Sequence, residues 1–198
     1  MSGPRSPRLI GLAGAGGAGK STAAQILREI GFEVVVVSAP LKAAFRAMLA
    51  SLGVSGLTIE RMVEGDLKRA PCRVLAGKSP TEAMQSLGGD WGRDMIGAGV
   101  WIDPARRKAG RLLAAGGRVA LDNVRFQNEA QAVRDLGGEV WRVIGRADMD
   151  PGTAAHGSER FGGPYDRILR NVGTREDLVA AIFAALDRRG DDPSIEQG

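Results

Sequence analysis

The chain has 198 residues, 43% of them hydrophobic, which is enough for one domain with a substantial core. Its 27 basic and 23 acidic residues give a net charge of +4, and the arginines are scattered without a basic block, so we expect no direct contact with nucleic acid. No apolar run approaches the length of a bilayer span, and residues 1–7 lack the hydrophobic segment of a signal peptide. We therefore expect a cytoplasmic protein without membrane contact. The single cysteine, Cys72, cannot form an internal disulfide, which agrees with a reducing compartment.

The first expected elements flank a glycine-rich loop. Residues 9–13 form a short apolar run typical of a buried strand, and residues 21–30 have the apolar spacing of a helix that Gly31 would end. Residues 14–21 between them read G-A-G-G-A-G-K-S, which satisfies both the dinucleotide pattern G-x-G-x-x-G and the P-loop pattern G-x-x-x-x-G-K-[ST]. Either pattern predicts that backbone N–H groups at the start of the helix bind an anion.

The chemistry around this loop favours the P-loop. A dinucleotide site needs an acidic residue about 20 positions further on to hold the ribose. Residues 36–40 read V-V-S-A-P and contain no acid. We therefore expect Lys20 to reach the β- and γ-phosphates of a nucleotide and Ser21 to ligate Mg²⁺. The expected nucleotide contacts are Gly14, Gly16, Gly17, Ala18, Gly19, Lys20, Ser21 and Thr22.

The rest of the chain alternates between expected strands and helices. A β-branched run at 32–37 predicts a second strand, followed by a helix at 41–52. The region 53–99 is helix and loop without a convincing strand, and Ser79 opens one of its helices through a capping box. Three more strands and three helices follow, at 103–115, 118–122, 127–136, 139–144, 167–170 and 174–186. Five short strands alternating with helices predict an α/β fold with a parallel sheet, helices on both faces and ligands at the C-terminal ends of the strands.

Two charged residues after the third expected strand are candidates for phosphate chemistry. Asp122 ends that strand on the P-loop side of the sheet, where an NTPase places the acid that orients Mg²⁺, and it is equally well placed as a helix N-cap. Arg125 follows three residues later, and a guanidinium there can bind a second phosphate through two oxygens. The sequence has no Cys/His spacing for a metal and no serine nucleophile motif. Phosphoryl transfer needs neither, because positioning and charge neutralisation carry it.

Several further motifs follow the P-loop along the chain. They are A-P-L-K at 39–42, L-G-G-D at 87–90 with Arg93 and Trp101, L-D-N-V-R at 121–125 with N-E at 128–129, H-G-S-E at 156–159 and N-V-G-T at 171–174. In this order and spacing, the series resembles the bacteriophage-type deoxynucleoside monophosphate kinases, a branch of the P-loop nucleoside monophosphate kinases. The resemblance covers most of the chain.

The resemblance implies a single P-loop NTPase domain that uses ATP and Mg²⁺ to phosphorylate a deoxynucleoside monophosphate. It implies that ATP lies on the P-loop with a further contact from Asn171, and that Ser21 and Asp122 ligate the metal. A homodimer is compatible with it. The implied catalytic residues are Lys20, Arg125 and Arg146.

The same resemblance implies two further parts of this domain. Residues 53–99 would form a helical insertion that binds the acceptor, and residues 145–164 a lid that brings Arg146 onto the phosphates. The segment 145–164 is polar and rich in glycine, as a closing segment requires. The implied acceptor contacts are Lys42, Arg93, Asp122 and Arg125.

The chain departs from this family at two places, and other functions stay open. Many relatives carry Asp-Thr after the P-loop lysine where this chain has Ser21 and Thr22, and an arginine is common where Thr81 stands. Another small-molecule P-loop kinase, such as a dephospho-coenzyme A kinase, is an alternative, although its second strand typically ends in an acidic motif that residues 38–40 lack. A non-enzymatic or nucleic-acid-dependent P-loop module is a third. The only histidine, His156, is expected to be a structural or exposed side chain.

Overall fold

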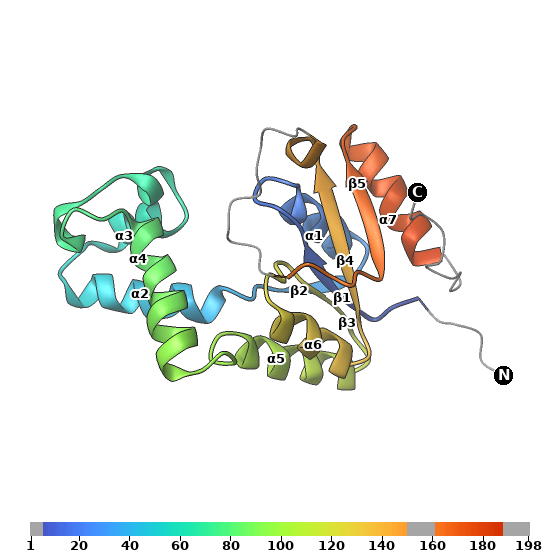
Figure 1. Cartoon of the computed structure of the whole chain (residues 1–198), viewed down its shortest axis with the longest axis horizontal. Helices are drawn as coiled ribbons and strands as arrows, with labels where there is room; N and C mark the ends of the chain where they lie inside the picture. Colours follow the sequence, from blue (N-terminus) through green and yellow to red (C-terminus); the bar gives the residue numbers. More distant parts are fainter. Residues whose placement is uncertain (1–5, 150–160, 188–198) are drawn as a thin grey trace. The chain divides into compact units, whose positions relative to one another are not determined.

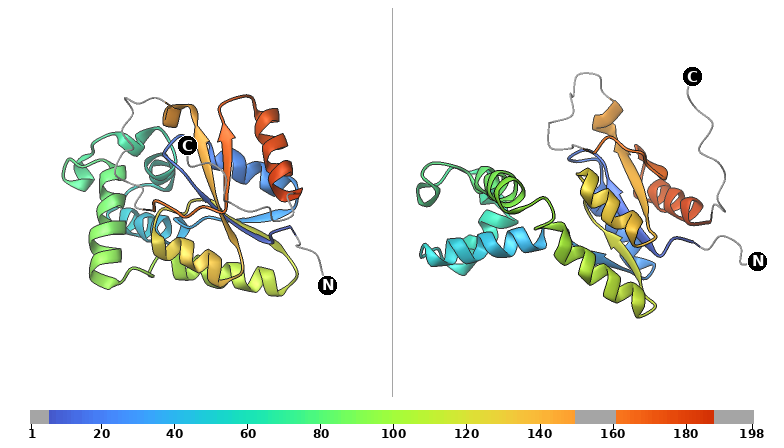
Figure 2. Two further views of the ribbon diagram at one scale, coloured as in Figure 1. Left: turned by 45° about the vertical axis from the view of Figure 1, so that its right-hand side comes forward. Right: turned by 60° about the horizontal axis from the view of Figure 1, so that its bottom comes forward.

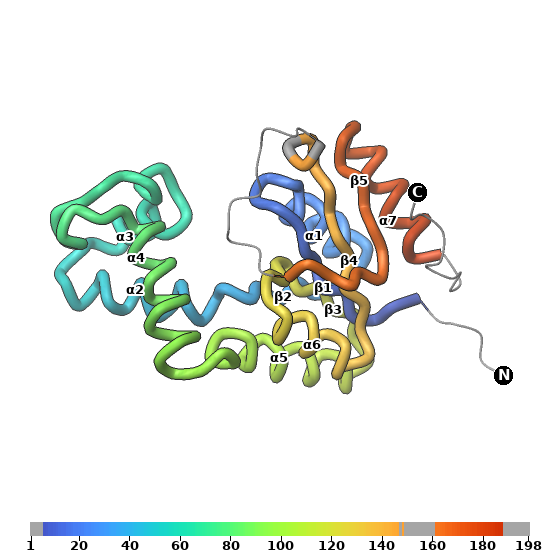
Figure 3. The backbone as a smooth tube through the Cα atoms, in the orientation of Figure 1, coloured from blue at the N-terminus to red at the C-terminus, as the bar shows by residue number. Residues whose placement is uncertain are grey.

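A computed structural model describes residues 6–149 and 161–187 of the chain (Figure 1). The chain forms two compact units, one made of Met1–Val36 with Ala105–Gly198 and the other of Val37–Pro104. We call them the sheet unit and the helical unit. Figure 3 traces the path of the chain, which leaves the sheet unit after its second strand and re-enters it along α5.

The sheet unit is built on five parallel strands in the order β2-β3-β1-β4-β5. Every residue of the central strand is buried, as expected of an apolar run covered on both faces. The predicted α/β fold with a five-stranded parallel sheet is therefore confirmed, with strand ends within two residues of the predicted ones. The strands are β1 (Leu9–Ala13), β2 (Phe32–Val35), β3 (Arg118–Leu121), β4 (Glu139–Gly145) and β5 (Arg167–Asn171).

Helices cover both faces of this sheet (Figure 2). Ile10 and Leu12 of β1 point into a core that α1 (Lys20–Glu29) and α7 (Arg175–Asp187) close. Gly11 points to the opposite face, where a Cβ atom would lie 2.8 Å from the Val133 side chain of α6 (Gln127–Asp135). The alternation follows from the two-residue period of a strand, so the missing side chain at Gly11 lets α6 pack closely. Beside α6 lies α5 (Ile102–Ala114).

The helical unit has its own small core. Phe45 and Leu49 of α2 (Ala39–Ser51) pack with residues of α3 (Gly56–Val63) and α4 (Pro80–Ser86). Residues 53–99 are all described and contain helices and loops but no strand, as predicted. The capping box at Ser79 is confirmed, because its backbone N–H donates to Glu82 Oε2 at 2.8 Å and its Oγ accepts from the Glu82 N–H at 3.3 Å. The short helices between α3 and α4 are η1 (Asp66–Arg69) and η2 (Arg73–Leu75).

The helix after α4 widens into a π-helix, η3 (Leu87–Ile96), which the sequence analysis did not predict. Its glycines make room for the indole of Trp101, whose Nε1–H donates to the Gly88 carbonyl oxygen at 2.9 Å. A Cβ atom on Gly92 would overlap the same indole. Across the part of the chain that the structure describes, no helix is long and apolar enough to cross a membrane.

Candidate phosphate-binding site

The loop between β1 and α1 has the backbone geometry of an anion site. Gly14, Gly17 and Gly19 adopt φ values of 135°, 83° and 99°, which glycine reaches without the strain that a side chain would bring. The Ala18 N–H donates to the Ala15 carbonyl oxygen at 3.1 Å and closes the turn. Gly19 is the N-cap of α1 and supplies no side-chain cap, so the first N–H groups of α1 remain available to an anion.

The loop is pressed against the C-terminal ends of two neighbouring strands. A Cβ atom on Gly14 would overlap the Val143 carbonyl oxygen of β4, and one on Gly145 would lie 2.7 Å from Ala18 Cα. Asn171 at the end of β5 donates from Nδ2 to the Ala18 carbonyl oxygen at 2.9 Å. Asn171, predicted as an ATP contact, therefore holds the backbone of the loop through a hydrogen bond to Ala18.

The polar residues that follow the loop lie on the first turn of α1. Lys20 is half-buried, and its Nζ donates to the carbonyl oxygens of Gly14 and Ala15, the latter at 2.9 Å. The ammonium group is thus held at the loop. Ser21 and Thr22 are exposed, so their hydroxyls are open to a ligand.

The segment between β3 and α6, residues 122–126, lies beside the P-loop at the same edge of the sheet. The Val124 N–H donates to the carbonyl oxygen of Leu12 at 2.7 Å, two residues before the loop begins. The Asp122 N–H donates to the Val35 carbonyl oxygen of β2 at 3.3 Å. Since α6 begins at Gln127, with Phe126 in the N-cap position, the alternative interpretation of Asp122 as the N-cap of this helix is wrong.

Among residues 6–149 and 161–187, two buried polar atoms of this segment have no hydrogen-bond partner, Asn123 Oδ1 and Arg125 Nε. A guanidinium is always charged, so a buried nitrogen of this group needs an oxygen partner to offset its desolvation. Phosphate oxygens are suitable partners. The position and chemistry of Arg125 therefore fit its predicted contact with a phosphate.

The residues predicted to hold Mg²⁺ are hard oxygen donors on this edge. Ser21 offers a hydroxyl, and Asp122 is a half-buried carboxylate at the end of β3. Magnesium is usually bound through one or two protein oxygens together with phosphates and water. No group of three or more His, Cys, Asp and Glu residues suited to a metal occurs within 6–149 and 161–187. The donor set thus fits an ion that is shared with a nucleotide.

Two predicted acceptor contacts belong to the helical unit. Lys42 Nζ of α2 forms an ion pair with Glu64 Oε2 at 2.9 Å, and Glu64 also pairs with Arg46 at 3.2 Å. Burial opposes ionisation of Glu64, yet the hydrogen bonds and charges of Lys42 and Arg46 lower its pKa below the usual value. Arg93 is half-buried in η3.

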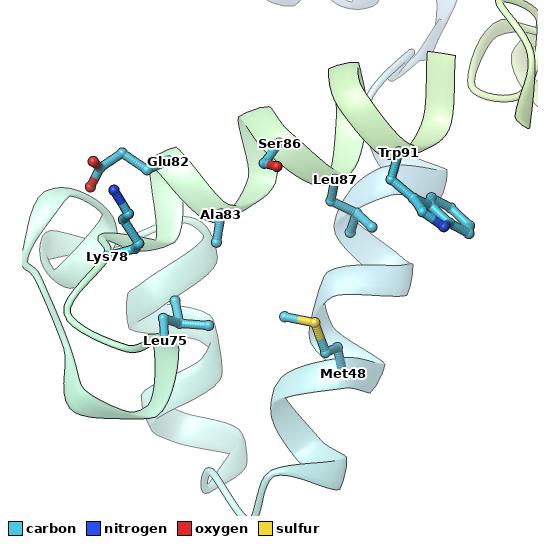
Figure 4. Close-up of a pocket in the computed structure, with 8 residues that line it drawn as sticks. All are labelled: Met48, Leu75, Lys78, Glu82, Ala83, Ser86, Leu87 and Trp91. Atoms are coloured by element: carbon cyan, nitrogen blue, oxygen red, sulfur yellow. The ribbon is translucent and has the colours of Figure 1, made fainter. Parts of the chain in front are cut away.

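A groove of about 620 Å³ also lies in the helical unit (Figure 4). Leu87 and Trp91 of η3 and Met48 of α2 are among the residues that line it, and Trp91 is 45% exposed. Arg93 does not line this groove. In a π-helix, residues four to five positions apart lie on one face. Arg93 and Trp91 are two positions apart and therefore face different directions. The groove is therefore separate from the face that carries the predicted acceptor contact.

The predicted lid is described only at its two ends. After β4, the helix η4 (Arg146–Met149) is fixed by a hydrogen bond from the Gly145 N–H to Asp148 Oδ2 at 2.6 Å. Arg146 is exposed and donates from Nε to the Val172 carbonyl oxygen at 2.9 Å. Residues 150–160, including His156, lie outside the described residues. At the other end, Arg134 of α6 donates to the Pro164 carbonyl oxygen at 2.6 Å.

Glu129 was named above only as part of the N-E motif at 128–129 and was given no place in the site. Glu129, in the first turn of α6, is only 4% exposed, and its Oε2 accepts from the N–H groups of Arg125 at 2.7 Å and Phe126 at 3.2 Å. A signal existed, because Glu129 stands three residues after the N-cap, where a capping box places its glutamate. No Ser, Thr, Asp or Asn occupies that N-cap position, so the pattern was incomplete.

Comparison with known proteins agrees with this geometry. No family model matches the chain. A protein of Acanthamoeba polyphaga mimivirus named "Putative deoxynucleotide monophosphate kinase" is 29% identical over 195 residues, which cover 90% of this chain and 96% of the viral protein. The crystal structure of TT1252 from Thermus thermophilus superposes with a TM-score of 0.50 at 21% identity, covering 92% of this chain and 97% of that one.

The structural likeness supports the fold, and the viral relative carries the resemblance in sequence. The likeness to TT1252 extends over nearly the whole of both chains and agrees with the α/β fold described above. The viral protein is matched over almost its full length as well. The resemblance first noted in the motifs of this chain is confirmed by its similarity to this viral protein.

Proposed function

We propose that the protein transfers the γ-phosphoryl group of ATP to a deoxynucleoside monophosphate and releases ADP and the deoxynucleoside diphosphate. The observation that carries this proposal is the P-loop beside the buried, unpartnered Arg125 Nε, which together offer sites for two phosphate groups at one edge of the sheet. The name of the viral relative suggests the acceptor.

On the donor side, the N–H groups at the start of α1 bind the β-phosphate and Lys20 neutralises charge on the transferring group. A phosphate oxygen of the acceptor forms a bond to the γ-phosphorus while the bond between that phosphorus and the bridging oxygen of ADP breaks. Ser21 and Asp122 would hold Mg²⁺, which supplies charge neutralisation on the phosphates when bound.

On the acceptor side, Arg125 binds the monophosphate through its guanidinium. Asp122 is a second acceptor contact from the same segment. Lys42 contributes from α2 and Arg93 from the insertion 53–99. Arg146 completes the charge when the lid 145–164 closes. The acceptor oxygen is already anionic at neutral pH, so the reaction needs no strong general base.

The proposal is tested by a coupled ADP-release assay with ATP and Mg²⁺ against deoxy- and ribonucleoside monophosphates, dephospho-coenzyme A and single-stranded DNA. We expect the highest kcat/KM with a deoxynucleoside monophosphate and formation of its diphosphate. Turnover with dephospho-coenzyme A alone, or hydrolysis that only DNA stimulates, would replace this function by one of the alternatives.

A further inference from the structure

The inference concerns the carboxylate of Glu129. Among the described residues, Glu129 and Ser79 are the polar side chains that are buried, at 4% and 5% exposure. Ser79 is explained by the capping box of α4. Burying a carboxylate is costly unless hydrogen bonds compensate it, so the contacts of Glu129 indicate what it is for.

Those contacts are made with the loop that precedes the helix. The glutamate of a capping box accepts from the N–H of the N-cap residue, which here is Phe126, and Glu129 Oε2 accepts in addition from the N–H of Arg125 before it. The bond to Arg125 is the shorter of the two, 2.7 Å against 3.2 Å. Glu129 therefore fixes the peptide from which the Arg125 side chain emerges.

The same segment is anchored at two further points. The bonds from Val124 to Leu12 and from Asp122 to Val35 attach it to β1 and β2. These anchors fix the start of the segment, and Glu129 fixes its end. The backbone of Arg125 is thus defined on both sides, while its Nε is buried without a partner. Because its backbone is fixed, the Arg125 guanidinium needs little reorganisation to bind a ligand in one defined geometry.

We propose that Glu129 is a positioning residue, which holds Arg125 in the orientation that binds the phosphate of the acceptor. This rests on the proposed function, in which Arg125 contacts that phosphate. In this proposal Glu129 acts through the reach of its side chain, whose Oε2 accepts from two backbone N–H groups.

The first test separates reach from charge with three variants, Glu129→Gln, Glu129→Asp and Glu129→Ala. The Gln carbonyl oxygen can accept the same two bonds, so this variant retains acceptor kcat/KM within a few-fold. Asp keeps the charge but is one methylene shorter, and Ala removes the acceptor atom, so both lower acceptor kcat/KM by about 10-fold or more while the KM for ATP changes less than about twofold. Loss in the Gln variant with full activity in the Asp variant overturns the proposal.

A helix-stability control accompanies these variants. Ala132→Gly weakens the middle of the same helix without touching the bonds at its start. Its thermal unfolding midpoint should fall, and its acceptor kcat/KM should stay near the wild-type value. If it loses the acceptor as the Asp variant does, general weakening of α6 explains the effect and the positioning role is rejected.

The decisive test is a double-mutant cycle with Arg125→Ala. If Glu129 acts through Arg125, then Glu129→Asp has no further effect on the acceptor once Arg125 is absent, whereas independent roles give losses that multiply. The cycle is measured on acceptor kcat/KM and also on the acceptor Kd by calorimetry without ATP. Multiplying losses overturn the inference alone, and binding without transfer in the wild type overturns the proposed function alone. Absence of acceptor binding in the wild type overturns both.

Discussion

The two units hold the side chains that are candidates to bind phosphate in different ways. In the sheet unit, backbone hydrogen bonds define the loop and the segment 122–126, and the side chains that emerge are partly buried. In the helical unit, Lys42 is held by an exposed network with Glu64 and Arg46. Backbone bonds persist when one side chain is changed, and exposed ion pairs contribute little to stability. The sheet unit is therefore preorganised for phosphates, and the helical unit is adjustable.

The largest effect should come from the centre of the preorganised region. Lys20→Met removes the ammonium group at the P-loop and should lower kcat at least about 100-fold with the fold intact, because a fixed charge at the transferring group is lost. Circular dichroism and the acceptor Kd serve as controls, since neither depends on this charge. Turnover within a few-fold of the wild type would show that the loop does not act in the transfer.

Arg125 should come next and should separate the two substrates. Arg125→Ala should weaken transition-state binding of the acceptor by roughly 2 to 4 kcal/mol, measured as a lower acceptor kcat/KM, with ATP affinity nearly unchanged. Arg125→Lys should restore only part of this loss, because a point charge lacks the bidentate geometry of a guanidinium. Arg107→Ala, an exposed arginine on α5, is the matched control. If Arg125→Ala weakens ATP and spares the monophosphate, Arg125 belongs to the donor side.

A smaller effect is expected behind the loop. Asn171→Ala removes the bond to the Ala18 carbonyl oxygen and should raise the KM for ATP by a few-fold to about 10-fold. Asn171→Asp should be worse, since it places a second oxygen against that carbonyl. If both variants bind ATP as tightly as the wild type does, measured by nucleotide titration, the loop keeps its shape without this hydrogen bond.

The smallest effect belongs to the adjustable unit. The pKa of Glu64 is lowered in the folded protein, so its ion pairs stabilise the protein above its unfolded pKa of about 4.5, and this contribution is lost as the pH falls through the lower folded value. Because the carboxylate is 46% exposed, the gain is screened and small. Glu64→Gln should therefore melt slightly below the wild type at pH 7, and the two should converge at acidic pH. A difference that grows on acidification contradicts this assignment.

Local patterns were sufficient for much of the sheet unit. The apolar run of β1, the glycine loop and the spacing of α1 are adjacent in sequence, so the sequence predicted them together with the five parallel strands. The capping box at Ser79 was predictable for the same reason, because both partners lie within one turn.

Contacts between distant residues explain what the sequence analysis missed. The π-helix η3 depends on Trp101 packing against Gly88 and Gly92, and nothing local to those glycines indicates an indole. The alternative role of Asp122 as an N-cap failed because the segment continues past it to bond with β1 before α6 begins. The position of Lys42 after β2 suggested a phosphate contact, while its ion-pair partner Glu64 follows α3, 22 residues further along the chain.

The bond between Val124 and Leu12 has a consequence for how the two halves of the reaction are kept in register. The strand β1 leads directly into the phosphate loop, and its Leu12 carbonyl oxygen also accepts the hydrogen bond that anchors the segment bearing Arg125. In the proposed reaction, the spacing between donor and acceptor phosphates is then a property of the folded scaffold, set before either nucleotide binds. Little reorganisation remains to be done at the moment of transfer, and substitutions inside β1 should alter the distance over which the phosphoryl group travels more than the affinity for either substrate.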